Sequence, residues 1–175
     1  MLAALAFFAI APTQAYLPTG PRVRFELWDG RSFVIATDPK SSPKTVAHIL
    51  SLVRSGFYDR QRVHRVESWV TQWGSPASRD KPLDSEAVTG GGSGKNLPFE
   101  ESQVDFLRGV VGVASTGLQR GGDSQLFILK HDTPRLWRSY AVVGKVVSGM
   151  DVVGTIQRGD RFRRAAVLAK VPSEP

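Results

Sequence analysis

Hydrophobic and polar residues alternate after residue 21 in the pattern typical of β-strands. Between Arg22 and Trp28, valine, phenylalanine and leucine alternate with charged residues, so every second side chain shares one face. Asp29-Gly30 follows, a pair that favours a tight hairpin turn because glycine accepts a positive φ. The chain is therefore predicted to return over residues 31–37 as a second strand.

A helical spacing replaces this alternation over residues 43–56. Apolar residues recur there at intervals of three or four, at Val46, Ile49, Leu50 and Val53. Ser41 and Ser42 are candidates for the N-cap, and Pro43 fits the first helical turn. Gly56 fits the C-cap position. We expect one face of this helix to cover apolar surface.

Short β-type runs separated by glycine-rich turns make up most of the remaining chain. Their sequences are QRVHRV, SWVTQW, GVVGVAS, SQLFILK, YAVVGKVV and AAVLAK. A second short helix is predicted at about residues 150–157. Many short strands with only one or two helices indicate a mainly β fold, either a closed barrel or a sandwich. The length of 175 residues suits a single domain.

The residue content excludes several kinds of chemistry. The chain has no cysteine, which rules out disulfides and a thiol nucleophile. The three histidines, His48, His64 and His131, are too dispersed to predict a metal site. We therefore expect no metal and no cofactor, and we expect a structural role for His64.

The glycine-rich stretch Thr89–Asn96, TGGGSGKN, is superficially similar to a phosphate-binding loop. Such a loop needs a glycine five residues before the Gly-Lys pair and a serine or threonine after it. Thr89 and Asn96 occupy those positions, and Leu97-Pro98-Phe99 follows where a helix is required. The stretch is predicted to be a flexible surface loop and not a nucleotide site.

Basic residues outnumber acidic ones by 23 to 16, which gives a net charge of +7. Such a balance permits binding to polyanions, and a basic adaptor for polyanions is one alternative function. The basic residues are nevertheless scattered, and the densest group contains Arg158, Arg161, Arg163 and Arg164. Scattered charges are typical of a solvated face. We expect no nucleic-acid partner.

The first fifteen residues, MLAALAFFAIAPTQA, differ from the rest because they are uncharged and mostly apolar. An apolar run that ends in small residues is typical of a secretory signal peptide, here ending at Ala15. The run is too short to cross a bilayer core of about 30 Å, so no stable membrane insertion is expected.

Residues 16–21 are predicted to form a linker and residues 22–171 the domain. Export to the periplasm or medium is the preferred location, and the cytoplasm is the alternative.

Six segments occur in the order and spacing of one known family. They are PKTVAHILSLVRSGFYD (43–59), VHRV (63–66), SWVTQWG (68–74), GVVGVAS (109–115), GGDSQLFI (121–128) and LWRSYAVVGKVVSGMDVV (136–153). Together they resemble the cyclophilin family from about Arg22 to Lys170. The resemblance implies a closed eight-stranded antiparallel barrel capped by two α-helices. It also implies a peptidyl-prolyl cis-trans isomerase that assists protein folding, and we expect a monomer that binds proline-containing polypeptide segments.

The same resemblance assigns candidate site residues. Arg65 would stabilise the twisted imide as the catalytic residue, and Gln72 would hold a substrate carbonyl. The remaining assignments are Trp69, Val70, Phe127 and Leu136 for the proline pocket, Ala114, Ser115 and Gln125 for the peptide backbone, and Tyr140 for the rim. This chemistry needs no nucleophile, because rotation about the peptide bond is opposed by a resonance barrier of about 18–20 kcal/mol. A guanidinium near the prolyl nitrogen stabilises the state that has lost this resonance.

Several features depart from the family pattern, among them Leu126 in place of a common phenylalanine. The stretch between Arg65 and Gln72 is one residue shorter, and a one-residue slip in a strand reverses the face of every side chain. Trp73 stands where the family usually has glycine. These two departures favour the alternative of a non-catalytic proline-peptide-binding module on the same fold. Arg135 replaces an aromatic residue that contacts cyclosporin in many relatives, so the resemblance implies weak inhibition by that drug.

Overall fold

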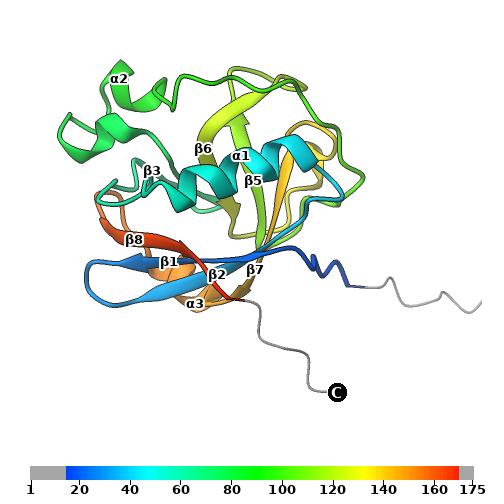
Figure 1. Ribbon diagram of the computed structural model, residues 1–175, viewed down its shortest axis with the longest axis horizontal. Helices are drawn as coiled ribbons and strands as arrows, with labels where there is room; N and C mark the ends of the chain where they lie inside the picture. Colours follow the sequence, from blue (N-terminus) through cyan, green and yellow to red (C-terminus); the bar gives the residue numbers. More distant parts are fainter. Residues whose placement is uncertain (1–14, 170–175) are drawn as a thin grey trace, which may run out of the picture.

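Eight antiparallel strands form one sheet in the computed structural model, which describes residues 15–169 (Figure 1). The strands are β1 (Arg22–Leu27), β2 (Ser32–Thr37), β3 (Arg65–Val66), β4 (Val70–Trp73), β5 (Val110–Ser115), β6 (Gly122–Leu129), β7 (Val142–Ser148) and β8 (Phe162–Val167). Each strand predicted from the sequence overlaps one of them, and the mainly β prediction is confirmed. The predicted signal peptide, except Ala15, and the predicted end of the domain beyond residue 169 lie outside the described residues.

The sheet has the order β3-β4-β6-β5-β7-β2-β1-β8 and curls around the core. Backbone bonds connect the segments that precede the two end strands. Val63 N donates to Asp160 O at 2.9 Å, and Phe162 N donates to Gln61 O at 2.9 Å. These bonds bring the two ends of the sheet together and leave the outer face of β3, β4 and β6 available for a site.

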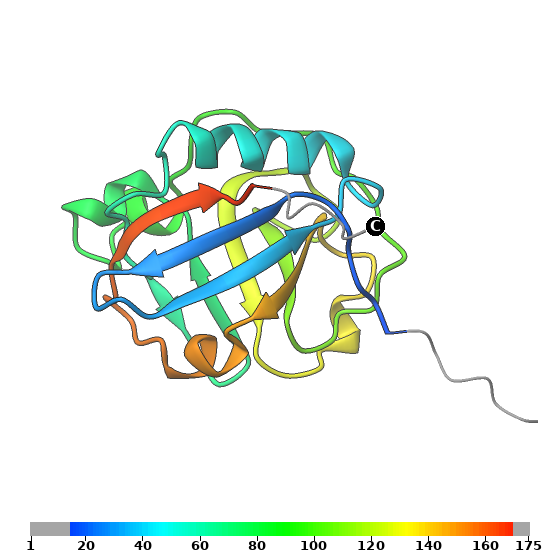
Figure 2. The same ribbon diagram turned by 60° about the horizontal axis from the view of Figure 1, so that its bottom comes forward.

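Three helices accompany the sheet, namely α1 (Pro43–Arg54), α2 (Glu86–Thr89) and α3 (Met150–Thr155). Figure 2 shows α1 over one end of the barrel and α3 at the opposite end, which matches the two predicted capping helices. The single turn α2 was not predicted from the sequence. Two 3-10 turns complete the regular structure, η1 (Pro76–Arg79) and η2 (Pro134–Leu136). The described part of the chain contains no helix that is long and apolar enough to cross a membrane.

The N-terminus of α1 is capped from a distant part of the chain. Ser42 occupies the N-cap position, as the sequence indicated, but its hydroxyl makes no capping bond. The Glu100 carboxylate accepts from Lys44 N at 3.0 Å and from Thr45 N at 2.7 Å. A negative charge at this end is stabilised by the helix dipole. The cap therefore ties the long loop before β5 to α1.

Strand alternation divides the core into two clusters, one on each face of the sheet. In β6, Leu126 and Ile128 point into the main cluster inside the barrel, whereas Phe127 and Leu129 point into a smaller cluster on the other face. Trp73 fills the centre of the barrel with its ring against Phe25 and is fully buried. The smaller cluster lies outside the barrel, and a ligand would meet the partly exposed residues that pack against it, among them Trp69 and Tyr140.

His64 is a buried polar residue immediately before β3, with 5% of its surface exposed. Its Nδ1 has no hydrogen-bond partner in the part of the chain that the structure describes. Burial, which disfavours the charged imidazole, lowers the pKa of His64 to about 4. The neutral, buried ring fits the structural role expected for it.

This burial predicts a pH dependence of stability. The folded pKa of His64, about 4, lies below its ordinary value of 6.5, so the unfolded chain takes up the proton first as the pH falls. Stability that is fully present above pH 6.5 is therefore lost progressively towards pH 4. Between pH 7 and pH 4.5 we expect the protonation of His64 to lower the free energy of unfolding by about 2 kcal/mol. Urea unfolding of wild type and His64→Gln at both pH values measures it. An equal pH dependence in the two proteins would contradict the prediction.

Candidate functional site

One row of residues crosses four neighbouring strands and forms the base of the site. Arg65 in β3 lies opposite Gln72 in β4, and Gln72 lies opposite Phe127 in β6. Phe127 in turn lies opposite Gly112 in β5. Directly opposite residues in antiparallel strands place their side chains on the same face. The pairing therefore brings a cation, an amide and an aromatic ring together from segments far apart in the sequence.

Gly112 makes room for the aromatic ring. A Cβ atom at this position would lie 2.5 Å from Cζ of Phe127. Any larger residue would push the ring away from the sheet. The glycine in GVVGVAS therefore allows Phe127 to lie flat at the base of the smaller cluster.

The predicted pocket residues meet in this smaller cluster. Val70, Phe127 and Leu136 are buried members, and Trp69, Ala114 and Tyr140 pack against them with part of their surface exposed. The ring centroid of Phe127 lies 5.3 Å from that of Tyr140, in an edge-to-face arrangement. The result is an apolar patch with an aromatic rim, suitable in chemistry for a proline ring.

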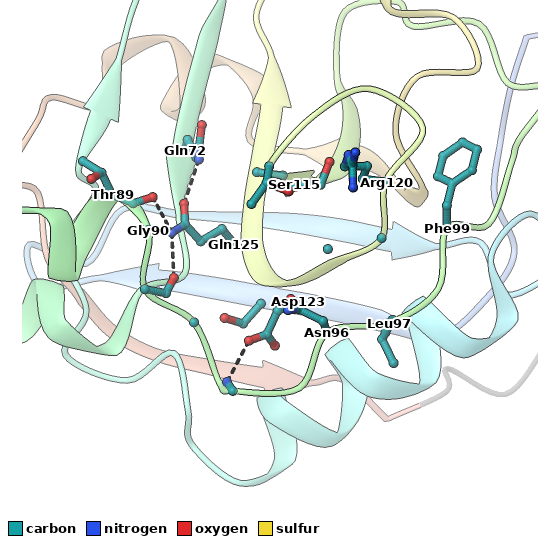
Figure 3. A pocket seen from close by; sticks show the side chains of 18 of the residues that line it. Gln72, Thr89, Gly90, Asn96, Leu97, Phe99, Ser115, Arg120, Asp123 and Gln125 are labelled. Carbon is teal, nitrogen blue, oxygen red and sulfur yellow. Dashed lines mark hydrogen bonds between the residues drawn. The ribbon is translucent and has the colours of Figure 1, made fainter.

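A chain of hydrogen bonds runs from Arg65 through Gln72 and Gln125 to backbone carbonyls of residues 89–91, and Figure 3 shows its part from Gln72 onward. Arg65 Nη1 donates to Gln72 Oε1 at 3.2 Å, and Gln72 Nε2 donates to Gln125 Oε1 at 2.8 Å. Gln125 Nε2 then donates to backbone carbonyls, at 3.0 Å to Thr89 O and at 2.7 Å to Gly91 O. Because each amide is held at both ends, the orientation of Gln72 relative to Arg65 is fixed.

Beside this chain lies a cavity of about 780 Å³. Its lining includes Gln72, Gln125, Ala114 and Ser115 together with residues of the glycine-rich stretch 89–96 (Figure 3). The Ser115 hydroxyl donates to Gly117 O at 2.6 Å. Nine of the ten residues assigned from the resemblance thus lie at the apolar patch or at this cavity. The tenth, Arg65, lies next to them, bonded to Gln72 and with its Cζ 5.4 Å from the centroid of the Trp69 ring.

Asp123 holds the glycine-rich stretch in place, a role that the sequence did not reveal. Its Oδ2 accepts from Gly94 N at 2.8 Å, and its Oδ1 lies 3.1 Å from His48 Nε2. The Ser93 hydroxyl also donates to Oδ1. The stretch was predicted as a flexible surface loop, but it is bound to β6 and lines a cavity. Only the spatial proximity of β6 could have indicated this, since Asp123 follows the stretch by almost thirty residues.

The missing residue between Arg65 and Gln72 falls in a turn. Residues 67–69 connect β3 to β4, and Glu67 N donates to Val70 O at 2.9 Å to close the hairpin. The strands on either side keep their pairing, so Arg65 and Gln72 share one face. The deletion does not reverse the side chains of the site.

Trp73 also leaves the site undisturbed. Its side chain points into the barrel and not towards Gln125, because it alternates with Gln72 along β4. The positive φ in this part of the chain, 117°, belongs to Gly74. The bulky residue is therefore accommodated without backbone strain.

Glu67 adds a negative charge next to the row. Its carboxylate lies 2.7 Å from Arg65 Nε, and the hydrogen bond from Arg65 lowers the pKa of Glu67 below its ordinary value. Glu67 was not singled out in the sequence, because a lone glutamate in a turn gives no functional signal. Within residues 15–169 no group of three or more acidic or histidine side chains could hold a metal ion.

Comparison with known proteins agrees with this geometry. The family model for cyclophilin type peptidyl-prolyl cis-trans isomerase/CLD matches residues 22–172. A probable peptidyl-prolyl cis-trans isomerase of Brucella abortus (strain 2308) is 40% identical over 174 residues, covering 95% of this chain and 88% of the relative. Peptidyl-prolyl cis-trans isomerase B of Bacillus subtilis (strain 168) is 32% identical over 146 residues, covering 82% and 95%.

Solved structures share the fold at low sequence identity. A cyclophilin-type isomerase of Cryptosporidium parvum, crystallised in the presence of the dipeptide Ala-Pro, has a TM-score of 0.71 at 19% identity and covers 85% of this chain and 99% of that one. The cyclophilin AquaCyp293 of Hirschia baltica has a TM-score of 0.68 at 20% identity and covers 90% and 77%. The match of the family model over most of the chain and the similarity to the two isomerases are decisive. The chain belongs to the cyclophilin-type peptidyl-prolyl cis-trans isomerases.

Proposed function

We propose that Arg65 is the catalytic residue of this isomerase and that the apolar patch around Phe127 binds the substrate proline. The proline ring would lie against Phe127, Val70 and Leu136, with Trp69 and Tyr140 at the rim. Ala114, Ser115 and Gln125 would contact the peptide backbone beside it. The observation that carries the proposal is the row in which Arg65, Gln72 and Phe127 lie on adjacent strands with their side chains on one face.

The chemistry requires no covalent step. In the planar ground state the prolyl nitrogen shares its lone pair with the carbonyl, and in the twisted state it does not. A guanidinium next to this nitrogen donates a hydrogen bond to the freed lone pair, so it stabilises the twisted state more than the planar one. Gln72 keeps the guanidinium over the patch and can hold a carbonyl of the substrate. An apolar base strengthens this electrostatic contact because it excludes water from one side.

The catalytic function is favoured over a non-catalytic binding module. That alternative rested on the shortened segment and on Trp73. The shortening lies in the turn at residues 67–69, and Trp73 lies in the barrel core. Neither departure separates Arg65 from Gln72, which remain within hydrogen-bond distance at 3.2 Å.

We also propose that the protein acts on unfolded or loop X-Pro segments of exported polypeptides, outside the cytoplasm. Support comes from the sequence of residues 1–15, which has the apolar run and small-residue end of a signal peptide. Slow X-Pro isomerisation, which takes on the order of tens to hundreds of seconds, limits folding after export as it does elsewhere. An isomerase in that compartment would assist folding there.

Replacement of Arg65 by alanine tests the mechanism. We expect kcat/KM for a proline peptide in a protease-coupled assay to fall about a hundredfold, the usual effect of removing one donor to the transition state. Arg65→Lys should recover only part of the loss, because an ammonium lacks the planar fork of donors. Arg163→Ala is the control, since Arg163 is an exposed arginine on β8. Equal rates for wild type and Arg65→Ala would remove the mechanism.

Cell fractionation tests the location. Expressed in a bacterium with a periplasm, the full chain should appear outside the cytoplasm. Its measured mass should match a protein whose first residue is Tyr16. A variant that starts with Met directly before Tyr16 should stay in the cytoplasm and be equally active. Retention of the full chain in the cytoplasm with residues 1–15 intact would contradict export.

A further inference from the structure

Glu67 binds two residues of the site with one carboxylate. Its Oε1 accepts from Arg65 Nε at 2.7 Å, and its Oε2 accepts from Trp69 Nε1 at 2.8 Å. Arg65 ends the contact chain that passes through Gln72, and Trp69 forms part of the rim of the apolar patch. We propose that Glu67 is a positioning residue for the isomerase reaction, which acts by fixing the guanidinium of Arg65 and the indole of Trp69. This inference rests on the proposed catalytic role of Arg65.

The effect on Arg65 follows from the shape of its guanidinium. The group is planar, so bonds at two of its nitrogens fix both its position and the direction of its remaining donors. Glu67 binds Nε and Gln72 binds Nη1. The other Nη hydrogens then have a defined direction before a substrate arrives. A catalytic group that is already oriented loses less entropy in the transition state.

The effect on Trp69 is similar. Its ring lies within cation–π distance of two arginines, with Cζ of Arg65 at 5.4 Å and Cζ of Arg135 at 5.0 Å from the ring centroid. The bond from its Nε1 to Glu67 fixes the edge of the ring. Glu67 thereby holds Trp69 against Arg65 at the place where the chain is one residue shorter than the family pattern.

The solvent exposure of the Arg65–Glu67 ion pair argues against a large contribution to folding stability. The side chains of Arg65 and Glu67 are 42% and 45% exposed. Ion pairs in contact with solvent contribute only about 0–1 kcal/mol to folding. A misplaced catalytic group, in contrast, can reduce the rate by as much as about a hundredfold. Glu67 should therefore matter much more for turnover than for folding.

The chain offers a matched control. Asp29 and Arg31 form a pair with the same separation of two residues, at the hairpin turn between β1 and β2. The distance from Arg31 Nε to Asp29 Oδ2 is 2.7 Å, equal to that in the Arg65–Glu67 pair. The turn is at residues that contribute nothing to the apolar patch or the cavity. Asp29→Asn removes a comparable ion pair without touching the site.

The test compares Glu67→Gln with Asp29→Asn on a proline peptide. We expect Glu67→Gln to lower kcat/KM about tenfold, mainly through kcat, with thermal unfolding within a few degrees of wild type. Asp29→Asn should retain the activity of wild type. Unchanged kcat/KM in Glu67→Gln would overturn the proposal, and an increase would show that the carboxylate restrains the arginine instead of positioning it.

A double-mutant cycle separates positioning from a general structural effect. In an Arg65→Lys background, which lacks the Nε donor, Glu67→Gln should lose the part of its effect that passes through Arg65. Only the part that passes through Trp69 should remain, a change in kcat/KM of about twofold. A full tenfold loss in that background would show that Glu67 acts independently of Arg65 and would also overturn the proposal. Failure of the proposed catalytic role of Arg65 is distinguishable from failure of this inference, because it would appear as normal activity in Arg65→Ala.

Discussion

The pairing of β3, β4, β6 and β5 is the constraint on which the site depends. Because side chains alternate between the faces of a strand, the register decides which residues fill the barrel and which face a ligand. Trp73, Leu126 and Ile128 fill the barrel, and Gln72 and Phe127 lie on the opposite face. A shift of one residue in β4 would exchange these roles, bury Gln72 and expose Trp73. The large cost of such an exchange keeps this row in register.

Rigid contacts around the row give the site its order. Gln125 connects Gln72 to the backbone of the glycine-rich stretch, and Asp123, two residues earlier on β6, binds the same stretch from the other side. Both residues therefore tie β6 to this loop, and the bond from Ser93 N to Ser124 Oγ at 3.1 Å adds a third connection. A loop held in this way contributes a fixed wall to the cavity, so a peptide can bind across it without ordering the loop first.

The departures from the family pattern are absorbed where the fold tolerates them. Loops accept insertions and deletions more readily than strands, since strand pairing continues on either side of the turn. The missing residue between Arg65 and Gln72 follows this rule. In the same turn, Glu67 supplies contacts to Arg65 and Trp69. The turn thus differs from the family pattern, while Arg65 and Gln72 keep their pairing across β3 and β4.

Local patterns in the sequence determined the elements of this protein. The alternation after residue 21, the helical spacing at Val46 to Val53 and the glycine at Gly30 depend only on neighbouring residues, and β1, β2 and α1 lie where these patterns predict. The order of motifs further identified the family and ten candidate site residues. Tertiary structure alone decided the long-range contacts. Glu100 caps α1 and Asp123 binds the glycine-rich stretch because folding brings distant segments together, and no periodicity records such a pairing.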